Sequence, residues 1–238
     1  MIVKLSSRVG IVLYSVLVLS VMYGLEPAAA DPPMPIASPR EGNDSLRAVL
    51  KYLWPLFSSA KRTSRIYYHA VCPRDDHSYP LTFPKIDVRQ PSKTGTDLTV
   101  VRSMFRHDPN VAVREDETGV VRIRIGEVPD TILKTRISRL SLDAESQYNV
   151  LSAIGAIESA PEVQSVMGKL GISVPTRYYH YRLLQPADDL PHLPAEILNV
   201  TMDQALDMIA RTWGVIVFYG ACAAPATYEV FFADNVYF

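Results

Sequence analysis

The sequence has little of what most catalytic and cofactor-binding motifs require. Its 11 glycines do not cluster, and it has no glycine-rich phosphate loop, dinucleotide-binding fingerprint or serine-nucleophile motif. None of its 5 histidines stands in an HxH or HExxH spacing. Basic and acidic residues nearly balance, at a net charge of −1, whereas nucleic-acid-binding proteins are usually basic. These absences favour a non-enzymatic protein without a cofactor, and they argue against a nucleic-acid partner.

Long apolar runs are missing after the first thirty residues, so no later segment approaches the roughly 20 residues that span a bilayer. Residues 1–30 are themselves typical of a signal peptide. Lys4 and Arg8 precede an apolar run at residues 11–22, and the alanines at 28–30 offer a cleavage site. An uncleaved membrane anchor is the alternative. We therefore expect export to a periplasmic or secreted location, with no stable membrane span after cleavage.

Cysteine is also scarce, with Cys72 and Cys222 as the two in the chain. An exported protein meets an oxidising compartment, where two cysteines can form a disulfide. A bond between them would close a loop of about 150 residues and stabilise the fold by about 4–5 kcal/mol in the chain-entropy model. Two unpaired cysteines are the alternative. Neither cysteine stands in a CxxC motif, so a catalytic thiol is not favoured.

One pattern, in contrast, occurs twice. Residues 66–88 and 177–200 each contain Tyr-Tyr-His, then Pro-x-Asp-Asp, then further prolines and a short apolar segment. The spacing from His69 to Ile86 equals the spacing from His180 to Ile197. Self-similarity of this kind indicates a duplicated module.

Hydrophobic periodicity predicts the order helix, strand, strand, helix, strand, strand in each copy. The second copy adds an opening strand and divides its first helical region at Pro161. Helices are expected near residues 46–57, 97–105, 150–157, 161–170 and 201–213, and strands near 65–72, 86–88, 111–113, 120–125, 137–142, 177–184, 197–200, 215–219 and 228–232. We predict an α+β fold of two tandem small mixed-sheet modules, with helices packed on one face and an internal repeat relating the modules. After a proline-rich leader at 31–42, the first module covers residues 43–128 and the second covers residues 129–238.

The second module contains the clearest local motif, a short strand, a capped helix, a glycine-ended turn and an apolar strand. The residues that carry it are Asn199, Val200, Thr201, Ala205, Leu206 and Gly214. This stretch resembles the secretin and TonB short N-terminal domain, best over residues 197–232, and the repeat suggests a duplicated copy. The resemblance implies a periplasmic module of the kind found at the N-termini of outer-membrane secretins and transport receptors, where it contacts partner proteins.

The polar residues of the repeated pattern are the candidate site. They are His69, Asp75 and Asp76 in the first copy, and His180, Asp188 and Asp189 in the second. If the two copies face each other, these side chains could perform acid–base chemistry or bind a metal. Alternatively, the aspartates form turns after proline and the histidines lie half-buried on strands. We predict neither a metal nor a catalytic residue from this pattern alone.

Arginines gather in the middle of the sequence, at Arg102, Arg106, Arg122, Arg124, Arg136 and Arg139. They could present a basic surface to an acidic partner or an anionic glycan. The alternative is an ordinary solvated face of a sheet and a helix.

The expected function is that of an exported, non-enzymatic protein-interaction module with a role in envelope assembly, transport or signalling. Its partner would be an envelope protein bound at a sheet edge or a helix face. The alternative is a small-ligand-binding protein or a hydrolytic enzyme whose His/Asp site lies at the junction of the two repeats. The sequence predicts no oligomeric state.

Overall fold

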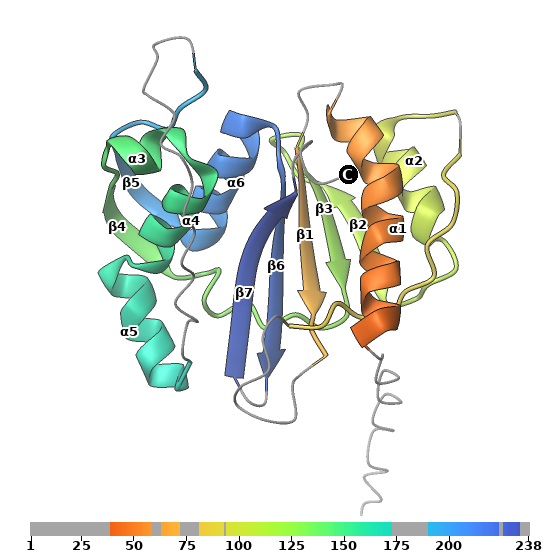
Figure 1. The fold of residues 1–238 in the computed structure, drawn as a ribbon, viewed down its shortest axis with the longest axis horizontal. Helices are drawn as coiled ribbons and strands as arrows, with labels where there is room; N and C mark the ends of the chain where they lie inside the picture. The colour runs from red at the N-terminus through yellow and green to blue at the C-terminus, as the bar shows by residue number, and fades with distance from the viewer. Residues whose placement is uncertain are drawn as a thin grey trace, which may run out of the picture. The chain divides into compact units, whose positions relative to one another are not determined.

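A computed structural model of the chain describes residues 39–58, 63–71, 81–92, 94–172, 190–223 and 226–233. The helices of this part are α1 (Pro39–Ser58), α2 (Asp97–Phe105), α3 (Ala144–Tyr148), α4 (Val150–Glu158), α5 (Pro161–Leu170) and α6 (Met202–Trp213). Its strands are β1 (Ser64–His69), β2 (Val111–Glu115), β3 (Val121–Ile125), β4 (Arg136–Ser141), β5 (Glu196–Thr201), β6 (Ile216–Ala223) and β7 (Ala226–Ala233). The α+β class is confirmed (Figure 1).

Strands from both expected modules share one sheet. In the described residues the order is β2-β3-β1-β6-β7, and β4 and β5 form a separate two-stranded ribbon. β1 pairs in parallel with β3 and with β6, so that Ile66 lies opposite Ile123 on one side and Phe218 on the other. The expectation of one sheet per module is therefore wrong. β1 is buried on both of its faces, and such a strand belongs inside a sheet rather than at its edge.

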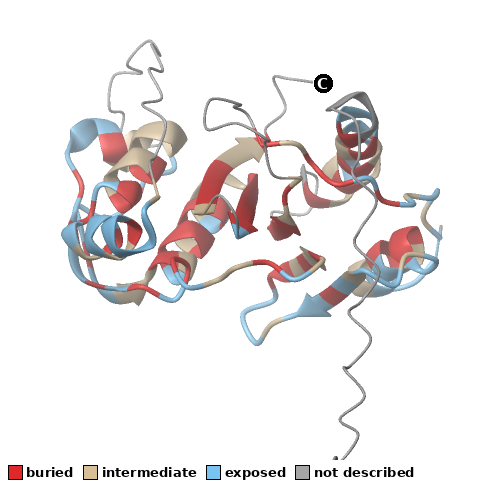
Figure 2. Cartoon of the chain, turned by 90° about the horizontal axis from the view of Figure 1, so that it is seen from below, coloured by how far each residue is buried: buried red, intermediate tan, exposed pale blue. Residues whose placement is uncertain are grey.

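Helices cover both faces of this sheet, whereas the sequence predicted one face. On one side, Leu53 of α1 and Met104 of α2 pack against Ile66 and Phe218. On the other side, the residues of α6 pack with Tyr67 and the neighbouring residues of β6 and β7. Figure 2 shows buried residues in red where the helices face the strands. The alternation of side chains along β1 supplies an apolar side chain to each face.

Local sequence rules account for α6 and for the start of α1. Thr201 and Gln204 form the predicted capping box, and Gly214 ends α6 with a φ of 64°. α1 begins at Pro39, so residues 39–42 are helical rather than part of a leader. Proline suits the first turn of a helix because its missing N–H is not needed there. None of the described helices is both long and apolar enough to cross a membrane.

The internal repeat is not confirmed. Residues 86–88, expected as a strand, belong to no helix or strand. The Ile86 N–H instead donates to Ser45 Oγ at 3.2 Å, which holds this segment against α1. The matching segment of the second copy is β5, which pairs antiparallel with β4. The second Tyr-Tyr-His strand, at 177–184, lies outside the described residues.

Candidate functional site

Of the six polar residues predicted from the repeat, the structure describes His69. Its ring Nδ1 lies 2.9 Å from the Glu127 carbonyl oxygen, and the side chain is half-buried. Asp75, Asp76, His180, Asp188 and Asp189 lie outside the described residues. The junction site therefore stays a prediction. Within the described ranges, no group of three or more His, Cys, Asp or Glu side chains could hold a metal ion.

The predicted disulfide also involves a residue that is not described. Cys222 lies on β6 and is buried. Cys72 lies outside the described residues, so its pairing with Cys222 stays a prediction.

A dense cluster of charged side chains lies between the sheet and α6, and we call it the Arg–Asp clasp. Its members are Arg65 and Tyr67 of β1, Asp116 and Arg122 of the β2–β3 hairpin, and Asp203 and Asp207 of α6. Arg65 lies directly opposite Arg122 in the sheet, so two cations stand side by side. Asp203 and Asp207 are one helical turn apart and face the sheet together.

The two arginines share both carboxylates of α6. Arg65 Nη1 donates to Asp207 Oδ1 at 2.8 Å, and its Nη2 lies 3.1 Å from Asp203 Oδ1. Arg122 Nη1 donates to Asp203 Oδ2 at 3.0 Å, and its Nη2 donates to the other oxygen of Asp207. The Tyr67 hydroxyl donates to Asp203 at 2.9 Å. Every carboxylate oxygen of Asp203 and Asp207 is thereby engaged.

Burial sets the electrostatics of the clasp. The side chain of Arg65 is fully buried and that of Asp207 is 4 % exposed. Burial raises the pKa of Tyr67 well above its usual range, which keeps the hydroxyl protonated as a donor. Burial also raises the pKa of Asp207, while Arg65 and Arg122 oppose that shift. Because both carboxylates are paired with arginines of β1 and β3, the clasp connects α6 to the sheet through charged contacts.

A second buried polar contact lies on the opposite face of β1. The Tyr68 hydroxyl donates to the Glu229 carboxylate on β7, and the Leu81 N–H donates to the other oxygen at 3.2 Å. Gly220 of β6 lies between them, where an added Cβ would come within 2.2 Å of the Tyr68 ring. Glycine is thus required at position 220, because the Tyr68 side chain passes over β6 at that point.

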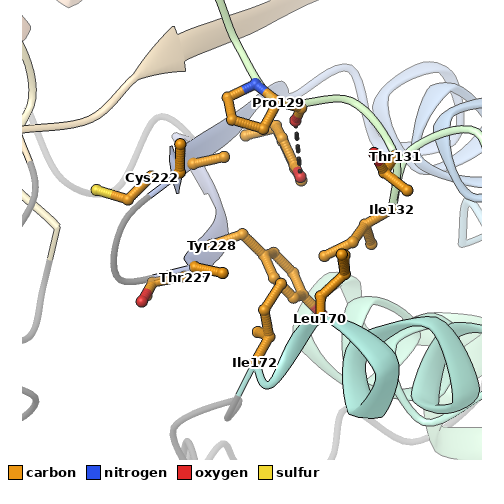
Figure 3. Close-up of a pocket in the computed structure, with 12 residues that line it drawn as sticks. Pro129, Thr131, Ile132, Leu170, Ile172, Cys222, Thr227 and Tyr228 are labelled. Carbon is orange, nitrogen blue, oxygen red and sulfur yellow. Dashed lines mark hydrogen bonds between the residues drawn. The ribbon is translucent and has the colours of Figure 1, made fainter. Parts of the chain in front are cut away.

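A cavity of about 210 Å³ opens at the end of the β6–β7 hairpin (Figure 3). Tyr219, Tyr228 and Ala221 form its buried floor, together with Ile132 from the segment after β3. Its rim includes Leu170, which is 41 % exposed. The described residues that line the cavity include no charged side chain.

The tyrosine hydroxyls of this cavity already have neighbours. The Tyr219 hydroxyl donates to the Pro129 carbonyl oxygen at 3.3 Å, the dashed line in Figure 3. The Tyr228 hydroxyl lies 3.3 Å from Met167 Sδ. Burial raises the pKa of Tyr219 above its usual range, so this hydroxyl stays neutral. The tyrosines therefore contribute ring surface to the cavity.

Sequence reasoning found neither the clasp nor the cavity. Of the arginines that gather in the middle of the sequence, Arg122 turns inward to α6 instead of presenting a basic surface. The one local sign of the clasp was Asp207, which stands among the apolar residues that α6 buries. No protein-family model, curated protein or solved structure matches this chain.

Proposed function

We propose that the chain is an exported, non-enzymatic protein-interaction protein that binds an envelope protein at the edge of β5. The observation that carries this proposal is the exposed edge residue Leu198, which at 59 % is the most exposed large apolar side chain of the described residues. Next to it, Arg139 and Glu196 form an ion pair across the ribbon. An apolar side chain with a polar surround is typical of the centre of a small protein interface.

The backbone of β5 is also suited to strand addition. The Leu142 N–H bonds the Ala195 carbonyl at 2.8 Å, and hydrogen-bonded pairs alternate along an antiparallel ribbon. By this alternation, the backbone groups of Glu196 point away from β4. The pairing is interrupted at Asn199, which has a φ of 57°, so the alternation is not carried on to Leu198. A partner strand could pair with the outward groups of Glu196.

The edges of β2 and β4 are partly occupied by the protein itself. On β2, Arg102 Nε donates to the Val113 carbonyl at 3.2 Å, and the Val111 N–H bonds to Asp108. On β4, the Ser138 N–H donates to Glu162 Oε1 at 3.0 Å. Side chains that cap an edge in this way oppose pairing with another chain. This contrast favours β5 over β2 and β4 as the docking strand.

The test is site-specific photocrosslinking in an envelope fraction of the source cells. A photoreactive residue at position 198 should capture one protein reproducibly, and the same residue at Leu190, 37 % exposed and outside β5, should not. Leu198→Glu should reduce recovery of that protein by about 30-fold, the effect of a central interface residue. Leu190→Glu is the matched control and should leave recovery unchanged.

Two results would reject this proposal. One is the absence of any reproducible partner at position 198, and the other is equal recovery from the Leu198→Glu variant and the wild type.

A further inference from the structure

The cavity at the β6–β7 hairpin exists because small residues occupy one face of the hairpin. Ala221 and Ala223 are two apart on β6, and Ala223 pairs with Ala226 of β7. Residues two apart on a strand point to the same face. Longer apolar side chains at these positions would fill the space between the hairpin, Ile132 and Leu170. The small residues on this face of the hairpin therefore leave the cavity unfilled.

The lining defines the chemistry of an occupant. The floor offers two aromatic rings, since Tyr219 and Tyr228 direct their hydroxyls to Pro129 and Met167. The polar side chains of the lining that remain are Thr131, on the exposed rim, and Thr227. With no charged side chain among the residues shown in Figure 3, a charged ligand would lose its hydration without gaining a counter-ion.

The size of the cavity limits the occupant further. An apolar cavity of about 150 Å³ is large enough to hold benzene. The present cavity, at about 210 Å³, has room for a somewhat larger ring system. Aromatic rings stack favourably on the faces or edges of other aromatic rings, which the two tyrosines supply.

We propose that this cavity is a binding site for a small, uncharged aromatic molecule of about ten non-hydrogen atoms. The site is distinct from the β5 edge, and it uses none of the six polar residues predicted from the repeat. Ligand binding here and partner binding at Leu198 can therefore succeed or fail separately.

The test is isothermal titration of the purified chain with indole as the probe and indole-3-carboxylate as its charged counterpart. Indole should bind saturably at one site, and the carboxylate should bind at least about tenfold more weakly because the cavity offers it no counter-ion. Thr131→Trp places a bulky ring on the exposed rim, and Ala221→Leu fills the floor. Each should weaken indole binding by about tenfold or more.

Glu127→Trp is the matched control, since Glu127 is an exposed residue that does not line the cavity. Its indole affinity should equal that of the wild type. If Ala221→Leu does not fold, Thr131→Trp decides the outcome. Absence of saturable indole binding would overturn the proposal. So would wild-type affinity in Thr131→Trp, or equal affinity for indole and its carboxylate.

Discussion

The Arg–Asp clasp and the hairpin cavity lie on the same side of the five-stranded sheet, yet they differ in what they can bind. Tyr67 of the clasp is in register with Tyr219 of the cavity on the adjacent strand. The clasp concentrates charged side chains, but its α6 carboxylates are already engaged by Arg65, Arg122 and Tyr67. The described residues that line the cavity include no charged side chain, and the cavity has unfilled space.

This difference shows that a high density of titratable residues does not by itself mark a site. A buried carboxylate whose oxygens are all paired with cations has no remaining capacity for chemistry. An apolar hollow retains capacity, because the atoms that line it lack contacts on one side. The unfilled space of the cavity is therefore the basis of the ligand-binding proposal.

The largest expected effect comes from breaking the clasp at its most buried carboxylate. Asp207→Ala would leave Arg65 fully buried without its closest counter-ion, and removing one partner of such a pair costs about 3–5 kcal/mol. Urea unfolding should show this loss in the free energy of unfolding. The double variant Arg65→Met/Asp207→Leu, which removes both charges, should be clearly more stable than the single variant.

Asp87→Ala is the control for that experiment, since it removes a surface carboxylate that is 45 % exposed and paired with Arg89. The free energy of unfolding should change by less than about 1 kcal/mol. If Asp207→Ala were no more destabilising than Asp87→Ala, the clasp would not hold α6 on the sheet.

A smaller effect is expected at the cavity. Ile132→Ala enlarges an existing hollow, and because Ile132 already lacks contacts on one side, the loss should be near the lower limit of about 2 kcal/mol. Ile137→Ala removes a fully buried side chain that does not line the cavity and should cost more. Thermal or urea unfolding of both variants measures the difference. Equal losses would mean that the cavity is filled in solution.

The helices and strands that follow local sequence rules for capping and alternation could be predicted from the sequence. The capping box at Thr201 and the glycine stop at Gly214 placed α6, and alternating apolar residues placed β3 with its buried and half-buried faces. The expected strand at 86–88 does not form. Its apolar residues pack in the same cluster as those of α1, and the Ile86 N–H donates to Ser45 instead of to a neighbouring strand. Short apolar runs do not distinguish these outcomes.

The clasp and the cavity could not be predicted because they depend on distant contacts. Arg65 and Asp207 are 142 residues apart in the sequence, and they meet because β1 lies between β3 and β6. Parallel pairing of this kind has no local sequence signature, since its connections are long. The cavity depends on the three-dimensional fit of alanines and rings, which strand patterns do not contain.

The smallest expected effect is at the solvent-exposed end of the clasp, where Asp116 supports Arg122 through a 2.8 Å hydrogen bond. Burial acts to raise the pKa of Asp116, but hydrogen bonds from Thr118, Val120 and Arg122 outweigh it and hold this pKa below the ordinary 3.8. The native state therefore favours the ionised carboxylate. The ionised Asp116 carboxylate stabilises the native state at pH values above its ordinary pKa. This stabilisation is lost as the pH falls toward the lowered pKa of the native state.

Asp116→Asn should accordingly lower the free energy of unfolding at pH 7 by less than about 1 kcal/mol, since the side chain is partly exposed to solvent. Urea unfolding at a series of pH values should show the difference from wild type shrinking below the ordinary carboxyl pKa. If the difference in the free energy of unfolding between Asp116→Asn and wild type stayed constant at low pH, Asp116 would act through its turn geometry rather than through its charge. The charged contacts of the clasp would then end at Asp203 and Asp207.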